Sequence, residues 1–290
     1  MGWEWRRAIF TRLILIEGIP GSGKTTFARR IADWYQTRGG AANLFLEGQS
    51  HPADLGWCAC IPAGMYGQLV QKYALLRSQI EEHTVFEGGI AIVAYTLVKT
   101  DNRDFYKELS AYEVYDARVA DDVFYNLHYE RWRAFGQGAS HSNALNIFEC
   151  AFLQNHVNEL LFWRDAGEDA IIAHHLKLIN SVAQLSPALI YLSQPDIRET
   201  IARIARERVS EDHGNWIDGC INYCENSTFG KRRGIKGFDG AMEFFAIRKQ
   251  LEMKIMAQLP IPKIIIENSE YDWDGVWSQI EKCLSAWFGA

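Results

Sequence analysis

The sequence predicts an α/β fold built on a doubly wound, parallel sheet of five strands. Five short apolar runs recur along the 290 residues, and segments with helical periodicity separate most of them. The first run leads directly into a glycine-rich turn and a helix-like segment. Strands joined through helices need crossover connections, which favour a parallel sheet. A hydrophobic content of 48% supplies enough apolar side chains for a buried core of this kind.

The first strand and the first helix are expected on either side of the glycine-rich turn. Residues 12–18, RLILIEG, form an Ile- and Leu-rich run that is typical of a buried strand. Residues 24–40 place Phe27, Ile31 and Trp34 on one helical stripe and stop at two glycines. The other four strands are expected in ANLFLEG (42–48), ALNIFE (144–149), PALIYLSQPD (187–196) and PKIIIENS (262–269). Further helices are expected in residues 196–209, 241–259 and 274–288.

The long gap between the second and third strands indicates an insertion. Residues 48–143 exceed what a simple crossover needs and are rich in aromatic residues. A hairpin turning at Gly88 and Gly89 and one or two helices in residues 111–135 are expected there. We therefore expect residues 1–290 to form a single domain, with residues 48–143 as a mainly helical, substrate-side insertion and residues 196–240 as a lid.

The glycine-rich turn carries the most specific motif. Residues 18–25, GIPGSGKT, satisfy G-x-x-x-x-G-K-[ST] between a predicted strand and a predicted helix. In such a loop, backbone N–H groups and the start of the following helix bind phosphate. Lys24 is expected to reach the β- and γ-phosphates of ATP, and the Thr25 hydroxyl to bind Mg²⁺. The predicted nucleotide-binding residues are Gly18, Pro20, Gly21, Ser22, Gly23, Lys24, Thr25 and Thr26.

Three strand-like runs end in a glutamate: LFLE at Glu47, TVFE at Glu87 in the predicted insertion, and NIFE at Glu149. Ligands of a doubly wound sheet bind beyond the carboxyl ends of its strands, so glutamates there would face the phosphates. Glu47 is expected to orient or deprotonate an acceptor hydroxyl, and Glu149 to hold a Mg²⁺-bound water. The structural alternatives are a strand cap for Glu47 and a backbone-bonded carboxylate for Glu149. Glu87 is expected to be a turn residue, and a contact with the acceptor is left open.

These segments together resemble the P-loop kinases, particularly thymidylate kinases and deoxynucleoside kinases. The resemblance lies in GIPGSGKTT, LFLEG, IFECAFLQN, PALIYLSQPDIRETIARIARER and the last strand with its closing helix, and it covers about half of the chain. It implies a P-loop kinase fold with an arginine-bearing lid. Cys150 is a departure, because the family often has arginine after the acidic residue of the third strand.

Cations that close over the phosphates would complete such a site. Arg203 and Arg206 are three residues apart on one predicted helix face and are the expected catalytic cations, beside Lys24, Glu47 and Glu149. The alternative for these arginines, and for Arg208 near the end of the same helix, is a solvated face that pairs with Glu199 and Glu207. The segment 227–240, with Lys231, Arg232 and Arg233 among four glycines, is expected to be a mobile or exposed basic loop.

The sequence therefore predicts an ATP- and Mg²⁺-dependent kinase that phosphorylates a small-molecule acceptor, such as a nucleoside or nucleotide. A natural-product or antibiotic kinase and a P-loop ATPase or switch acting on a protein partner remain alternatives. No N-K-x-D guanine signature follows the fifth strand. A homodimer is left open.

The net charge of -6 argues against nucleic-acid binding. No apolar run is long enough to span a membrane, and the start MGWEWRRAIFTR lacks the features of a signal peptide, so a cytoplasmic protein is expected. A zinc site at His213, Cys220 and Cys224 is a weaker alternative, because closed four-ligand sets are the rule for structural zinc.

Overall fold

The computed structural model describes residues 10–210 and 214–288 and divides the chain into two compact units. The first unit comprises the described residues up to Leu46 and from Arg133 onward, and the second comprises Glu47–Trp132. His213 and most of the N-terminal segment considered above lie outside the described residues. The predicted insertion boundaries at residues 48 and 143, and the lid at 196–240, stay predictions. The two units are described separately below.

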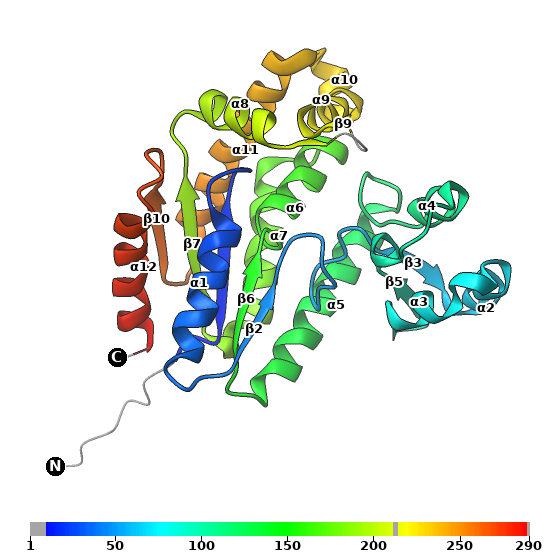
Figure 1. The fold of residues 1–290 in the computed structure, drawn as a ribbon, viewed down its shortest axis with the longest axis horizontal. Coiled ribbons are helices and arrows are strands. Elements are labelled where there is room, and N and C mark those ends of the chain that lie inside the picture. Colours follow the sequence, from blue (N-terminus) through cyan, green and yellow to red (C-terminus); the bar gives the residue numbers. More distant parts are fainter. Residues whose placement is uncertain (1–9, 211–213, 289–290) are drawn as a thin grey trace. The chain divides into compact units, whose positions relative to one another are not determined.

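The first unit is built on a five-stranded sheet in which every pairing is parallel. The strand order is β10-β7-β1-β6-β2, with β1 at the centre. Figure 1 labels β10, β7, β6 and β2 of this sheet from left to right. Its strands are β1 (Leu13–Gly18), β2 (Ala42–Phe45), β6 (Leu145–Glu149), β7 (Ala188–Ser193) and β10 (Lys263–Glu267). The predicted α/β fold with a five-stranded parallel sheet is confirmed. Each strand lies within one of the five apolar runs.

Helices surround this sheet. They are α1 (Lys24–Gln36), α6 (Gln154–Val157), the π-helical turn η3 (Asn158–Trp163), α7 (Glu168–Ser181), η4 (Ala183–Leu185), α8 (Ile197–Glu207), α9 (Trp216–Asn226), α10 (Thr228–Arg233), α11 (Gly237–Gln258) and α12 (Trp273–Phe288). A short pair, β8 (Val209–Ser210) with β9 (Gly214–Asn215), lies between α8 and α9. Helix α5 (Asp121–Ser140) contains the second boundary between the units.

One face of the sheet packs against α1 and α12. Alternate residues of the central strands, such as Ile14 and Ile16 of β1, form one buried cluster with Phe27 and Ile31 of α1 and Ile280 of α12. This alternation follows from the strand period of two. The opposite face carries Glu17 and Tyr191, whose neighbours are α6 and α11.

Glu17 is a fully buried carboxylate at the end of β1. Its Oε1 accepts hydrogen bonds from the backbone N–H groups of Phe152 (2.8 Å) and Leu153 (3.0 Å), and its Oε2 accepts one from Gln154 (3.2 Å). Burial raises the pKa of Glu17 from 4.5 to about 7, although these three hydrogen bonds act in the opposite direction. The residue directly before the glycine-rich loop thus fixes the segment that follows β6.

The segment after α9 differs from its prediction. The expected basic loop contains helix α10, in which the Ser227 hydroxyl accepts a hydrogen bond from the Gly230 N–H at 3.0 Å and Gly234 ends the helix in the left-handed conformation. Arg232 pairs with Asp165, and Arg233 lies 3.6 Å from Glu243. The prediction of a loop was wrong because the glycines were read as breaks, whereas Gly230 lies inside the helix and only Gly234 ends it.

The second unit combines a small antiparallel sheet with short helices. The sheet has the order β3-β5-β4, and β4 and β5 form the predicted hairpin around Gly88 and Gly89. Its elements are β3 (Ala59–Pro62), α2 (Ala63–Lys72), η1 (Ala74–Leu76), α3 (Arg77–Glu82), β4 (Thr84–Glu87), β5 (Ile90–Val93), η2 (Tyr95–Leu97), α4 (Arg103–Ser110) and the first part of α5. Sequence analysis missed β3 because the strand is short and ends in a proline, which argues against a central strand. In the structure β3 is an edge strand of its sheet, where a proline is tolerated.

Within the described ranges, no helix combines the length and the apolar character that crossing a membrane requires.

We predict that Glu17 makes stability depend on pH. A folded-state pKa near 7 lies above the reference value of 4.5, so the folded chain holds a proton that the unfolded chain releases between these values. The Glu17 contribution to the free energy of unfolding should therefore be fully present below about pH 4.5 and decrease as the pH rises to about 7. Chemical denaturation of the wild type and of Glu17→Gln across this range measures the difference, with the exposed Glu82→Gln as control. A difference independent of pH would contradict the prediction.

Candidate functional site

The glycine-rich loop joins β1 to α1 in a conformation that side chains would disturb. Gly21 and Gly23 have φ values of 79° and 97°, which L-residues with side chains rarely adopt. A Cβ on Gly21 would overlap the side chain of Ile204 on α8, and a Cβ on Gly23 would lie 2.8 Å from the Trp273 ring at the start of α12. Packing within the protein therefore requires these glycines, in addition to the expected need to leave backbone N–H groups accessible.

Helix α1 begins without a side-chain cap. Gly23 occupies the N-cap position in the left-handed conformation and offers no side chain to cap the first turn. The first N–H groups of a helix have no acceptor within the helix, so those of Lys24, Thr25 and Thr26 point away from its start. The start of a 13-residue helix also carries a partial positive charge. This end of α1 is suited to an anion.

Lys24 brings a full positive charge to the same loop. Its side chain is buried, and its Nζ donates hydrogen bonds to the carbonyl oxygens of Gly18 (3.0 Å) and Ile19 (2.9 Å). These two bonds curl the side chain back over the loop. Since an ammonium group has three N–H donors, one remains for an anion at the loop.

Thr25 and Glu149, the two predicted metal ligands, lie together. The Thr25 Oγ1 donates a hydrogen bond to Glu149 Oε1 at 2.5 Å, across 124 residues of sequence. Thr25 is on the first turn of α1, and Glu149 is the last residue of β6, beside β1 in the sheet. Because the carboxylate accepts the hydroxyl hydrogen, the Thr25 oxygen keeps its lone pairs for a cation. Two adjacent oxygen donors are the ligand type that Mg²⁺ prefers.

Asn268 makes a buried hydrogen bond to Ser22, which is part of the loop. Asn268, which follows β10, donates from Nδ2 to the Ser22 carbonyl oxygen at 2.9 Å. The Ser22 side chain is fully buried, and its Oγ has no hydrogen-bond partner among the described residues. An unpartnered hydroxyl inside the loop is a group that a phosphate oxygen could satisfy. Pro20 and Thr26 lie in the same segment and are more exposed than Ser22.

Arg203 of α8 reaches the loop through Tyr271. Its guanidinium stacks 3.4 Å from the centre of the Tyr271 ring, and the Tyr271 hydroxyl donates to the Gly21 carbonyl oxygen at 3.3 Å. Arg203 also lies 3.7 Å from Glu207, the helix-face partner of the structural alternative. Arg206 is exposed on the last turn of α8, and Arg208 lies over Trp216. Of Arg203, Arg206 and Arg208, the structure brings Arg203 to the loop.

Asn268, Tyr271 and Trp273 are contacts of the loop that sequence analysis did not assign. All three follow β10, at the carboxyl edge where ligands of a doubly wound sheet bind. The sequence ENSEYDW indicated a segment near the ligand side of the sheet, because its polar and aromatic residues directly follow a predicted strand.

Glu47 was expected to end a strand, but it lies beyond the end of β2. Strand β2 ends at Phe45, which pairs with Phe148 of β6, and Glu47 is exposed at the start of the second unit. The ladder ends there because β6 itself ends one residue later, at Glu149. Two residues of chain span at most about 7 Å, so the Glu47 backbone cannot be far from the end of β2. Its role stays a prediction.

Glu87 and His51 have structural partners within the second unit. Glu87 ends β4 before the hairpin turn and forms a 2.7 Å ion pair with Arg131. The His51 Nδ1 accepts hydrogen bonds from the N–H groups of Ala53 and Asp54, and burial followed by the charge of Arg131 lowers its pKa to about 3. His51 is therefore a neutral residue that holds its loop.

Cys150 takes a left-handed conformation directly after β6 and is buried. Arg248 of α11 interacts with it electrostatically, but this arginine is itself buried and lies 3.1 Å from the Glu252 carboxylate. Arg248 is thus part of the core and does not replace the arginine that the resembling kinases carry after their acidic residue.

The residues of the loop fit both a polyphosphate and a divalent cation. The first turn of α1, the Lys24 ammonium and the orphaned Ser22 hydroxyl offer donors to phosphate, and Thr25 with Glu149 offers oxygen ligands to Mg²⁺. The chain matches no model of a known protein family, and no curated protein matches it. Its function must be inferred from the chemistry of this site.

We predict that Gly21→Ala destabilises the protein, since the substituted residue would keep a left-handed backbone and overlap Ile204. Strain and overpacking each cost about 1–3 kcal/mol. Gly219→Ala is the matched control, because Gly219 lies inside α9 with open space around its Cβ position, and alanine there should stabilise the helix by up to about 1 kcal/mol. Urea denaturation measures both changes. Equal stabilities for the two variants would contradict the packing described for the loop.

Proposed function

We propose that the protein is an ATP-dependent kinase of the P-loop type that transfers the γ-phosphate to a small-molecule acceptor. The observation that carries the proposal is the Thr25–Glu149 hydrogen bond beside the Lys24 loop. Two side-chain oxygens thus lie next to the positive end of α1. This combination supports the proposal, because phosphoryl transfer from a metal-bound triphosphate needs cation ligands beside a phosphate site.

The loop residues would bind the triphosphate. N–H groups of the first turn of α1 would donate to phosphate oxygens, and Lys24 would keep at least one carbonyl contact while donating to the β- and γ-phosphates. Magnesium, when bound, would neutralise charge on the β- and γ-phosphate oxygens. Thr25 would hold that ion directly, and Glu149 would hold it directly or through a water.

Arg203 is the best supported lid cation. Its guanidinium stacks on the Tyr271 ring, whose hydroxyl donates to the Gly21 carbonyl oxygen, so this positive charge lies beside the loop. A cation at that place stabilises the charge that develops on the transferred group. The exposed Arg206 remains a weaker candidate for the same role.

The acceptor side of the proposal rests on Glu47. It follows β2, the parallel neighbour of β6, by two residues, and a carboxylate there is suited to orient an acceptor hydroxyl. A nucleoside, a nucleotide or another hydroxyl-bearing compound fits this chemistry. The alternative of a switch or ATPase acting on a protein partner shares the phosphate loop and differs in needing no small-molecule acceptor.

The deciding experiment measures ADP release by the purified full chain with ATP and Mg²⁺, with and without a panel of nucleosides, nucleotides and hydroxyl-bearing natural products. The proposal predicts slow release alone, a strong increase with one class of acceptor, and a phosphorylated product identified by mass spectrometry. Lys24→Ala should abolish the increase. Turnover that no acceptor increases would favour the ATPase, and undiminished turnover by Lys24→Ala would contradict the phosphate loop.

We predict that Thr25→Ala lowers acceptor phosphorylation by roughly 100-fold or more at limiting Mg²⁺, because it removes a cation ligand. Thr25→Ser is the matched control, since serine keeps the hydroxyl that donates to Glu149, and it should retain most of the activity. Rates measured against Mg²⁺ concentration distinguish the two variants. An equal loss in both would mean that the hydroxyl is not the group that matters.

We also predict that Glu47→Gln lowers the rate of transfer by roughly 100-fold while ATP binding changes little, because glutamine cannot accept the proton of the acceptor. ATP binding is measured by calorimetry and transfer by product formation, with the exposed Glu82→Gln as control. Loss of binding and of transfer to the same degree would exclude Glu47 as the acceptor-orienting group.

A further inference from the structure

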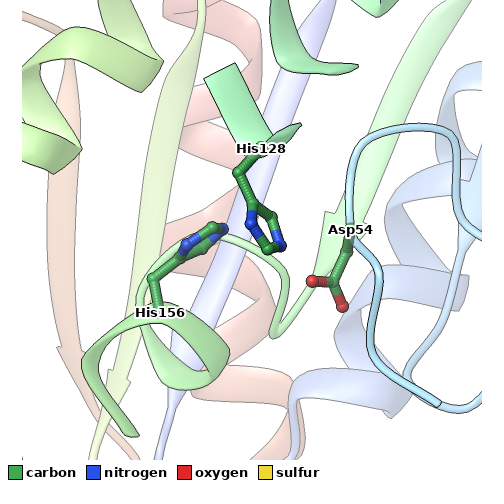
Figure 2. A group of neighbouring side chains, drawn as sticks. All are labelled: Asp54, His128 and His156. Atoms are coloured by element: carbon green, nitrogen blue, oxygen red, sulfur yellow. The ribbon is translucent and has the colours of Figure 1, made fainter. Parts of the chain in front are cut away.

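Buried polar side chains join segments of the chain in each of the two units. In the second unit, the Tyr115 hydroxyl donates to Asp54 Oδ1 at 2.6 Å and lies 3.2 Å from His128 Nε2, which links the loop before β3 to α5. Figure 2 labels Asp54 and His128, together with His156 of the first unit. In the first unit, a group of this kind centres on Gln194, and it reaches the glycine-rich loop.

Gln194 directly follows β7, which pairs with β1, and its side chain is buried. Its Nε2 donates a hydrogen bond to the backbone carbonyl oxygen of Asn268 at 2.5 Å. Its own backbone carbonyl oxygen accepts a hydrogen bond from the Lys249 Nζ of α11 at 2.8 Å. Because both the main chain and the amide of Gln194 are held, its side chain has a fixed direction at the carboxyl edge of the sheet.

Hydrogen-bonding chemistry determines which end of the Gln194 amide faces which neighbour. A carbonyl oxygen only accepts, so the NH₂ group of the amide must face the Asn268 backbone oxygen. The amide oxygen then faces the buried Thr200 hydroxyl of α8, at 3.3 Å. Gln194 thus connects the segment after β10 with α8.

Asn268 extends this connection to the glycine-rich loop. Its N–H donates to the Ser193 carbonyl oxygen at 3.0 Å, and its Nδ2 donates to the Ser22 carbonyl oxygen at 2.9 Å. Asn268 and Ser22 are both buried, so these hydrogen bonds lie in a medium of low dielectric constant, where they are strong. The relay from α8 to the loop consists of Thr200, Gln194, Asn268 and Ser22.

The Thr200 hydroxyl is the adjustable member of the relay. It carries one hydrogen, which it can donate either to the Asp196 carbonyl oxygen at 2.7 Å or to the Gln194 amide oxygen at 3.3 Å. The Asp196 oxygen also accepts the Thr200 N–H at 3.2 Å, so the first turn of α8 keeps a hydrogen bond when the hydroxyl turns toward Gln194. The contact between α8 and the relay can therefore tighten or loosen without unwinding the helix.

Other side chains of α8 also connect it with the loop, but with less directionality. Ile204 packs against Gly21, and Arg203 stacks on Tyr271, which contacts Gly21. Apolar packing is non-directional, whereas a hydrogen bond weakens steeply as its angle departs from linearity. We therefore expect the relay to set the orientation of α8 at its first turn, and with it the position of Arg203 on the same helix.

We propose that Gln194 is a positioning residue that couples the glycine-rich loop to α8. The Ser22 hydroxyl has no hydrogen-bond partner within the described part of the chain, so it can donate to a phosphate oxygen. A phosphate bound there orders the loop, and the relay transmits that order to α8, which holds Arg203 beside the transferred group. The inference rests on the proposed function for the identity of the ligand, but the coupling itself is a property of the folded chain.

Hydrogen exchange of the full chain, measured by mass spectrometry with and without ATP and Mg²⁺, tests the coupling without any need for catalysis. Gln194→Met removes both amide contacts and keeps a side chain of similar length. In the free protein it should speed exchange roughly tenfold in α8 and also in the loop with the first turn of α1, because the two ends of the relay loosen together.

ATP should slow exchange in both of these segments of the wild type, by roughly tenfold in α8. In Gln194→Met, ATP should still protect the loop, since the loop binds the phosphates, but it should no longer protect α8. Protection of α8 by ATP to the wild-type degree in this variant would overturn the proposal.

Tyr191→Phe is the matched control. It also removes a buried hydrogen bond that starts from β7, to Glu252 of α11 at 2.6 Å, but Tyr191 lies outside the relay. Exchange in α8 and in the loop should remain that of the wild type. Thr200→Val and Thr200→Ser form a second pair, which decides the question if Gln194→Met does not fold. Valine lacks the hydroxyl and should weaken the coupling, whereas serine keeps it and should preserve the coupling.

A kinetic cycle tests whether the coupling acts through Arg203. In the acceptor assay, Gln194→Met should lower kcat roughly tenfold and change the KM for ATP by less than about threefold, because it displaces a group that acts in the transition state. In an Arg203→Ala background the same substitution should lower kcat by less than about twofold, since the group that it positions is already absent.

Faster exchange in α8 alone, with an unchanged loop, would overturn the proposal, and so would an equal loss of kcat in both backgrounds. A chain that shows the coupled exchange but phosphorylates no acceptor would support the relay and contradict the proposed kinase. A chain that phosphorylates an acceptor without the coupled exchange would support the kinase and contradict the relay. If ATP does not bind, the exchange of the free protein still decides for or against the relay.

Discussion

The close approach of the loop after β1 to α8 and to the start of α12 is the constraint on which the candidate site depends. Gly21 lies against Ile204, and Gly23 lies against Trp273, so a side chain at either position would displace the backbone path between the sheet and α1. That path sets where the first turn of α1 begins. Because the start of α1 is fixed, the Thr25 hydroxyl meets Glu149 at the end of β6, and Lys24 turns back over Gly18 and Ile19.

Buried polar contacts hold this path from two further sides. Asn268 binds the Ser22 carbonyl oxygen from the segment after β10, and Glu17 gathers three N–H groups of the segment after β6. Segments that follow strands of one sheet therefore hold the loop, and Tyr271, which also follows β10, links Arg203 of α8 to it. Such preorganisation is what allows donors to stabilise a developing charge without first rearranging.

Much of this arrangement could be predicted because its signals are local. Apolar runs revealed all five strands, and the motif from Gly18 to Thr25 located the loop. Thr25 and Glu149 could be paired because parallel strands bring their carboxyl ends to one edge. The polar and aromatic run after β10 indicated a segment on the ligand side of the sheet, but the individual contacts of Tyr271 and Trp273 with Gly21 and Gly23 depend on how α12 packs against the loop. Helix α10 was missed because its glycines were interpreted as signs of a loop.

A crystal structure of the full chain with a non-hydrolysable ATP analogue and Mn²⁺ tests the central claim most directly, because the anomalous signal of manganese locates the cation independently of the nucleotide. The account predicts the phosphate chain over the first turn of α1 with Lys24 in contact. It also predicts a manganese peak about 2.2 Å from the Thr25 Oγ1, with Glu149 bound to the ion or to one of its waters. A nucleotide bound elsewhere, or a manganese ion away from both Thr25 and Glu149, would contradict it.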